Sequence, residues 1–247
     1  MRASARCIAL CLVLLAPSAA AQTFRLTIPL DGSVPSALAG MDRRAAAELG
    51  AVVLTGLGQL AASELGVSGP YIPVVVGGWG GYVGYRAATE PGYLDTLGLT
   101  GGDLGRSARD VGLIALGATA GMAAYGALNG SLSAKPELGL LLLLYPAWGV
   151  TQQLLVQGYV TRHLHGAGLP TAAVVPLSAL SFGTVHVPNW PLAGATTAMG
   201  GAFAPLYLRD RAVVPLGVAH GALGALFYTW VLDCDALAQL RGDACDG

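Results

Sequence analysis

The chain has 247 residues, of which 54% are hydrophobic and 11% are charged, and its formal net charge is −1. A soluble domain carries roughly 25% charged residues, so this composition excludes a water-soluble globule, and the near-neutral charge gives no indication of nucleic-acid binding. The mean hydropathy is +0.60. We therefore predict an all-α fold, a polytopic transmembrane helix bundle in contact with membrane lipids.

The N-terminus has the order of regions that is typical of a secretory signal. Arg2 and Arg6 are basic, an apolar run follows from Cys7 to Ala16, and small residues at 19–21 precede Gln22. We predict a signal peptide over residues 1–21. Its apolar run is too short to span a bilayer comfortably, which favours cleavage over the alternative of an uncleaved anchor.

Apolar segments of roughly 20 residues follow, which predicts about seven helices. The segments are 45–65, 70–86, 111–128, 138–164, 171–187, 191–208 and 213–232. The first is a weak span because Glu48, Gln59 and Glu64 interrupt it. We divide the chain into N-terminal membrane helices and a loop (22–137), a motif-bearing part (138–232) and a polar tail (233–247).

The arginines give the orientation of these helices. If the polar loop at 87–110 is cytoplasmic, most of the arginines fall on the cytoplasmic side, as the positive-inside tendency requires. These are Arg86, Arg106, Arg109, Arg162, Arg209 and Arg211. This orientation predicts a multi-pass protein of a bacterial-type inner (plasma) membrane. It conflicts with export from residue 22, because Arg43 and Arg44 would flank the first helix on the cytoplasmic side.

The same orientation places the polar tail outside the cytoplasm, where Cys234 and Cys245 can form a disulfide. His163 and His165 lie at a helix end, and we expect them to be interfacial residues without a chemical role. We predict no metal and no cofactor, because two neutral histidines without a carboxylate or thiolate make a poor metal site.

Five strongly polar side chains lie at membrane depth and each needs a partner there. Gln152, Gln153 and Gln157 are on the segment 138–164, His186 is near the end of the next segment, and His220 is within the last. Gln153 and Gln157 share a helical face, and Gln152 lies about 100° from Gln153. A lone membrane glutamine usually bonds between helices, but this set on three segments predicts a shared polar pocket.

These positions resemble the three motifs of the CPBP family, the CAAX proteases and bacteriocin-processing intramembrane proteases. Those motifs are Glu-Glu-x-x-x-Arg, Phe-x-x-x-His and His-x-x-x-Asn, on consecutive membrane helices. The corresponding residues of this chain are Gln152, Gln153, Gln157, Phe182, His186, His220 and Gly224. The order and the spacing agree, whereas both glutamates, the arginine and the asparagine are replaced.

The resemblance implies an intramembrane endopeptidase in which a glutamate activates water, histidines assist, and an asparagine holds the oxyanion. A carboxamide cannot accept a proton as a general base, and Gly224 has no side-chain donor. Loss of one oxyanion donor typically costs about 10²–10³ in rate. We therefore expect an inactive enzyme, or an altered one that uses His186 or His220 as the base.

Two alternatives remain open. One is a non-catalytic membrane protein of the binding, immunity or scaffold kind, with a membrane-borne peptide or protein as its partner. The other is a small carrier with a polar glutamine and histidine pocket. Nucleic acid is not expected as a partner of either.

Overall fold

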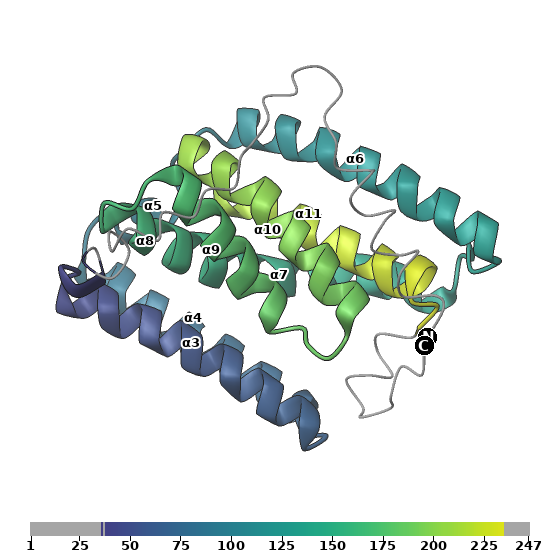
Figure 1. Cartoon of the computed structure of the whole chain (residues 1–247), viewed down its shortest axis with the longest axis horizontal. Coiled ribbons are helices and arrows are strands. Elements are labelled where there is room, and N and C mark those ends of the chain that lie inside the picture. The colour runs from purple at the N-terminus through teal and green to yellow at the C-terminus, as the bar shows by residue number, and fades with distance from the viewer. Residues whose placement is uncertain (1–35, 37, 235–247) are drawn as a thin grey trace.

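The computed structural model describes residue 36 and residues 38–234, and this part of the chain contains eight helices and no strand. The helices form one bundle (Figure 1). They are α3 (Arg43–Glu64), α4 (Ser68–Thr89), α5 (Tyr93–Leu97), α6 (Leu104–Asn129), α7 (Pro136–Gln153) continuing through the π-helical η1 (Leu154–Thr161) into α8 (Arg162–Gly166), α9 (Thr171–Thr184), α10 (Trp190–Asp210), and α11 (Val213–Leu226) continuing into the π-helical η2 (Phe227–Val231).

Four of the helices in the described part are long and apolar enough to cross a membrane. They are Arg43–Glu64, Leu104–Asn129, Pro136–Gly166 and Val213–Val231. The predicted helical membrane bundle is therefore confirmed, while the number of seven helices stays a prediction. Residues 45–65, which the sequence marks as a weak span, form one of the four.

The start of α6 and the end of α9 are among the boundaries that differ from those predicted. The helix expected at 111–128 begins earlier, at Leu104, because the Asp103 side chain accepts a hydrogen bond from the Arg106 amide and caps the helix. The helix expected to run to residue 187 ends at Thr184. His186 therefore lies in the turn after α9, rather than inside a helix.

Glycines bring α7 and α11 into backbone contact. A methyl group added at Gly149 would lie 2.6 Å from the Gly221 amide nitrogen and would overlap the Gly217 carbonyl oxygen. One added at Gly221 would lie 2.5 Å from the Pro146 nitrogen. Only glycine permits this approach of two helices. The consequence is that His220, between Gly217 and Gly221 in the sequence, is held close to α7.

The pair α9 and α10 packs in the same manner. A methyl group at Gly200 would lie 3.0 Å from the Ala179 Cα, and one at Gly183 would overlap the Thr197 side chain. In Figure 1 these two helices lie with α7 and α11 in the middle of the bundle, with α6 on one side and the α3–α4 pair on the other.

The α3–α4 pair is anchored to the bundle through η1. Tyr159 is fully buried, and its ring lies 4.9 Å from the ring of Trp79 on α4. Leu49 and Val52 of α3 pack against buried residues of η1 and α9, among them Val160. All eight residues of η1 are buried, so this π-helical segment is the centre of the contacts that hold the pair in place.

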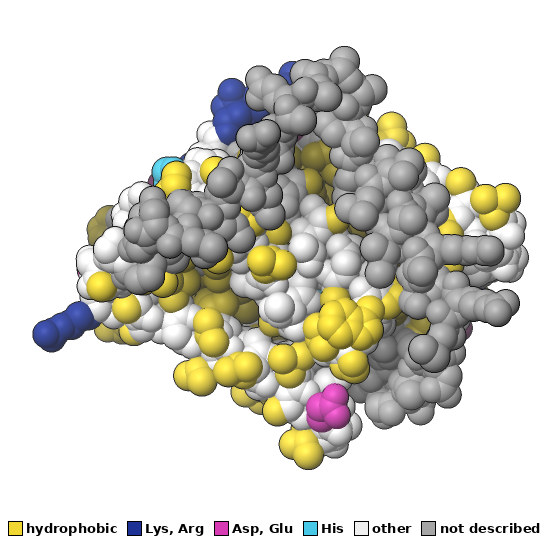
Figure 2. All heavy atoms as spheres, in the orientation of Figure 1, with side chains coloured by type: hydrophobic (Ala, Val, Ile, Leu, Met, Phe, Trp, Pro, Cys, Tyr) yellow, Lys and Arg dark blue, Asp and Glu magenta, His cyan; other side chains and the backbone are white. Residues whose placement is uncertain are grey.

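The surface of the bundle is largely apolar. Figure 2 shows hydrophobic side chains spread over the described part of one face, with charged side chains few and peripheral. Large exposed hydrophobic residues occur on several of the candidate spans; they include Val53, Leu54 and Leu57 on α3, Leu113 and Leu116 on α6, and Leu143 on α7. Such a surface is suited to lipid contact.

Several predictions fall on residues that the structure does not describe. The predicted signal peptide (1–21) and Cys245 lie outside the described residues. Cys234 is disulfide-bonded, and the remaining cysteines of the sequence, Cys7, Cys11 and Cys245, all lie outside the described part. The Cys234–Cys245 pairing stays a prediction.

Candidate intramembrane site

A cavity of about 150 Å³ lies between α6, α7, α10 and α11, with the turn after α9 closing one side. A water molecule needs roughly 10–15 Å³ of such space, so the cavity has room for several. Most of its wall is apolar or aromatic; examples are Ile114, Met122, Trp148, Met199, Phe203, Leu223 and Phe227. The polar contributions come from Gln152, His186, Thr196, His220 and three tyrosines.

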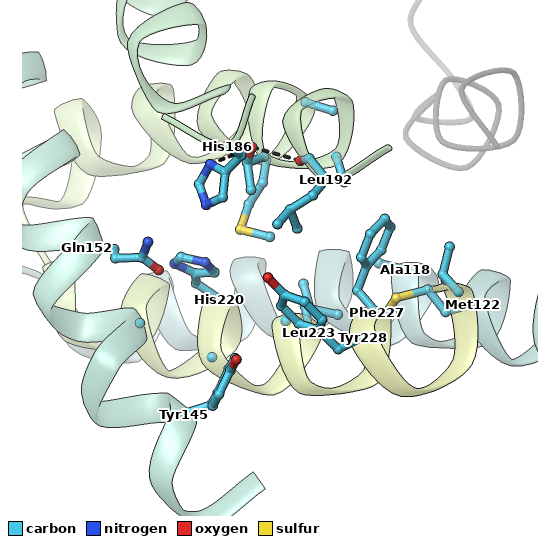
Figure 3. Close-up of a pocket in the computed structure, with 18 of the residues that line it drawn as sticks. Ala118, Met122, Tyr145, Gln152, His186, Leu192, His220, Leu223, Phe227 and Tyr228 are labelled. Atoms are coloured by element: carbon cyan, nitrogen blue, oxygen red, sulfur yellow. Dashed lines mark hydrogen bonds between the residues drawn. The ribbon is translucent and has the colours of Figure 1, made fainter. Parts of the chain in front are cut away.

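His186 presents one ring nitrogen for chemistry. Its Nδ1 lies 2.9 Å from the Phe182 carbonyl oxygen and 3.2 Å from the Thr196 hydroxyl. A carbonyl only accepts, so Nδ1 carries the proton and Nε2 of the neutral ring is an acceptor. In Figure 3 the ring turns toward Gln152 and His220. Thr196, which the sequence did not single out, thus helps to fix the tautomer.

His220 is held from the opposite side. The Gln153 amide nitrogen lies 3.3 Å from its Nδ1, and an amide nitrogen can only donate, so this Nδ1 accepts. Gln153 is fully buried, and its Oε1 has no hydrogen-bond partner among the described residues. Gln153 does not line the cavity itself. It lies behind His220 and orients the ring.

Phe182 lies between the two histidines. Its ring is fully buried and meets the His186 ring at 5.3 Å and the His220 ring at 5.1 Å, both edge to face at 77° and 80°. Such aromatic contacts contribute about 0.5–1.5 kcal/mol beyond area burial. The motif phenylalanine therefore fixes how the two imidazoles face each other.

Gln157 lies elsewhere. It is fully buried in η1, where its Oε1 accepts from the Thr161 hydroxyl at 2.8 Å, and that hydroxyl lies 2.8 Å from Ser178 Oγ on α9. Its Nε2 has no hydrogen-bond partner within the part of the chain that the structure describes. The structure thus separates Gln157 from the cavity and ties η1 to α9 through it. The other motif positions gather at the cavity: Gln152, Gln153, Phe182, His186, His220 and Gly224.

The gathered groups are all uncharged or weakly basic. Among the described residues that line the cavity there is no Asp, Glu, Lys or Arg. Within the described part no three His, Cys, Asp or Glu side chains lie close enough together to hold a metal ion. The arrangement can donate and accept hydrogen bonds and can orient water, and His186 Nε2 is its strongest proton acceptor.

A second polar cluster surrounds Glu48 and was not expected from the sequence. The carboxylate is buried on α3. It accepts from the Tyr82 hydroxyl at 2.5 Å, from the Arg86 guanidinium at 2.7 Å and from Arg162 at 3.4 Å, and it lies 2.6 Å from His163 Nε2. A carboxylate in an apolar segment requires such partners. The presence of Glu48 within the apolar segment 45–65 was therefore the signal that the sequence offered for this cluster.

His163, which we expected to be an interfacial residue without a chemical role, is instead buried, with an exposure of 8%, and its Nε2 lies 2.6 Å from a Glu48 carboxylate oxygen. His165 is exposed. The cluster extends outward through Glu90, which lies 2.6 Å from Arg86 and 3.0 Å from Arg44. The hydrogen bonds from Arg86 hold the pKa of Glu90 below its ordinary value.

No curated protein and no solved structure matches this chain. A protein family does match part of it, under half of the length, and that part contains every motif position from Gln152 to Gly224. The family is described as Rce1-like, type II CAAX prenyl endopeptidase. Residues 134–226 are thus similar to the Rce1-like endopeptidases of the CPBP family, and the resemblance that the three motifs indicated is confirmed.

Proposed function

We propose that the protein binds a membrane-borne peptide or lipidated protein tail in the α6–α7–α10–α11 cavity and does not hydrolyse it. The observation that carries this proposal is the side chain of Gln152, an amide where the family motif has a carboxylate, on a cavity wall whose described residues include no Asp or Glu. The family description suggests a prenylated tail as the ligand, and the apolar wall is suited to an isoprenoid chain.

Hydrolysis requires a group that takes a proton from water as it attacks the peptide bond. General-base catalysis contributes roughly 10²–10⁴ in rate, and a carboxamide does not supply it. Gln152 is still able to hold a water or a ligand group by hydrogen bonding. The cavity therefore retains the means to bind and lacks the carboxylate that would activate water. The protein is in this sense a pseudoenzyme of its family.

A second candidate function is an altered endopeptidase, and the geometry of His186 favours it. Because Nδ1 is bonded to the Phe182 carbonyl, Nε2 is left unprotonated in the neutral ring. An imidazole in that state accepts protons and takes the place of a carboxylate in many active sites. On this candidate, His186 is the base and Gln152 orients the water.

We further propose a bacterial-type inner membrane as the location. Four long apolar helices in the described part support a multi-pass protein. Arg86, Arg106 and Arg209 lie near the ends of their helices, which agrees with cytoplasmic placement of those ends.

The test replaces Gln152 by glutamate. The purified protein in liposomes is given prenylated peptides and matched unlipidated peptides, and cleavage is followed by mass spectrometry. We expect no cleavage above that of empty liposomes for the natural chain and measurable cleavage for Gln152→Glu, because the new carboxylate lies on the same wall as His220.

The control is the double variant Gln152→Glu/His186→Ala, which should be inactive. Robust cleavage by the natural chain that is lost on His186→Ala would instead establish the second candidate. Binding of the prenylated peptide, measured on the same liposomes by fluorescence, should be present in the natural chain and in both variants.

A further inference from the structure

Gly224 lies one helical turn beyond His220 on α11, and both residues line the cavity. Residues four apart share one face of a helix, and one turn advances about 5.4 Å along its axis. The imidazole of His220 and the main chain of Gly224 are therefore neighbours on the wall that α11 presents to a ligand. Gly224 occupies the position at which the family motif has an asparagine.

A side chain at residue 224 would find room in the cavity. Outside its own stretch of α11, a methyl group added at Gly224 would have two described atoms within 4 Å, the ring carbons Cδ1 and Cε1 of Tyr145, at 3.5 and 3.8 Å. Both are ordinary van der Waals distances. Gly149 and Gly221 also line the cavity, but methyl groups added there would overlap main-chain atoms of the facing helix. Those two glycines permit the contact of α7 with α11, whereas the missing side chain at 224 adds space for a ligand.

The cavity has a polar end and an apolar end, and Gly224 lies between them. His186 and His220 face each other at one end, while Phe227 lies toward the other (Figure 3). Along α11 and η2 the lining continues from His220 past Gly224 and Phe227 to Val231, a stretch of roughly 15 Å. A lipid chain whose peptide end meets the histidines would therefore have to pass residue 224 to reach the apolar end.

We propose that Gly224 determines the length of the isoprenoid chain that the cavity accepts. A side chain at this position would stand between the two ends and would close the apolar end to the ligand. Glycine leaves the passage open, with room for the methyl branches of an isoprenoid. This inference rests on the proposed function, since it assigns the lipid specificity of the same cavity to one residue.

The experiment measures dissociation constants for protein in lipid nanodiscs. The probes are fluorescent peptides that carry one, two, three or four isoprene units on a cysteine thioether. The natural chain is compared with Gly224→Leu and with a matched control, Gly117→Leu, on the exposed side of α6 and outside the cavity lining. The ratio of the variant and natural dissociation constants cancels the partition of each peptide into the lipid, because both proteins are in the same bilayer.

We expect Gly224→Leu to weaken binding of the peptide with three isoprene units about tenfold, because the ligand and the new side chain compete for one filled space. Binding of the peptide with one unit should change less than twofold, since its lipid ends before residue 224. Gly117→Leu should change every dissociation constant less than twofold.

Gly224→Ala gives a second test that does not depend on folding of the leucine variant. Its methyl group lies at ordinary contact distance from the Tyr145 ring, so thermal unfolding of this variant should match that of the natural chain. Its loss of affinity should be smaller than that of Gly224→Leu and should increase with chain length in the same manner.

Three results would overturn the inference while leaving the proposed function intact: unchanged affinities in both Gly224 variants, equal losses at every chain length, or the same dependence on chain length in Gly117→Leu. Failure of the natural chain to bind any of the prenylated peptides would overturn the proposed function and this inference together.

Discussion

Glu48 and Gln153 are both almost completely buried, at 5% and 0% exposure, yet their surroundings differ in kind. Around Glu48, two arginines, a histidine and a tyrosine direct hydrogen-bond donors at one carboxylate. Around Gln153, a single bond to His220 at 3.3 Å leaves the amide oxygen without a partner.

The difference shows where this fold keeps charge. A buried carboxylate is retained only with a full set of donors, because an unpaired buried charge costs several kcal/mol. A buried amide carries no net charge, so leaving one of its polar atoms without a hydrogen bond costs less free energy than leaving a charge unpaired. The chain therefore has a carboxylate where donors from several helices meet, and an amide where the only side-chain partner among the described residues is His220.

Removing the charge at residue 48 should give the largest effect on stability. Glu48→Gln removes the buried carboxylate shared by Arg86 and Arg162, while Arg86 keeps its ion pair with Glu90, so we expect a loss of up to about 3 kcal/mol, the lower end for breaking a buried pair. The free energy of unfolding in detergent micelles measures this loss. Glu64→Gln, the same change at an exposed position of α3, should stay within about 0.5 kcal/mol. If Glu48→Gln and Glu64→Gln lower the free energy of unfolding equally, the cluster around Glu48 adds no more stability than an exposed glutamate, and its contrast with the surroundings of Gln153 fails.

An apolar replacement at residue 153 should cost much less. Gln153→Leu removes one long hydrogen bond and also removes a buried oxygen that has no partner. The net contribution of such a bond is about 0.5–1.5 kcal/mol, and loss of the unpartnered oxygen offsets part of it. We expect a change below about 1 kcal/mol in the same unfolding assay. A loss as large as that of Glu48→Gln would mean that both regions depend equally on their polar groups.

The smallest expected effect concerns pH. The pKa of Glu90 is lowered, first by its hydrogen bonds from Arg86, so its contribution is present above the unfolded pKa of about 4.3. That contribution is lost as pH falls through the lower folded value. The melting temperature of the natural chain should therefore fall more steeply from pH 5 to pH 3 than that of Glu90→Gln. Parallel curves of melting temperature against pH for the natural chain and Glu90→Gln would show that the Glu90 ion pairs add no stability.

The helical membrane bundle followed from composition and from the length of the apolar runs, since both depend only on local sequence. The helix ends were harder to predict. The sequence predicted neither the end of α9 at Thr184 nor the π-helical stretch Leu154–Thr161, all of whose residues are buried. The first is flanked by Gly183 and Pro188, which indicate a helix end near residue 187 but not its exact position, and the second has an ordinary apolar sequence.

The motif spacing placed Gln152, His186 and His220 on segments that the structure brings to one cavity. The same reasoning did not place Gln157, which lies four residues beyond Gln153 and is joined to Thr161, whose hydroxyl contacts Ser178 of α9, rather than to cavity residues. Glu48 and His163 are 115 residues apart in the sequence. Their pairing depends on how α3 docks, which no local pattern indicates.

The contact between α7 and α11 is made by main-chain atoms at Gly149, Gly217 and Gly221. The frame that positions residues 152 and 220 is therefore independent of which polar side chains those residues carry. Glutamine and glutamate have nearly the same shape, and their codons differ by a single base. A change between glutamine and glutamate at residue 152 therefore leaves the contact between α7 and α11 in place.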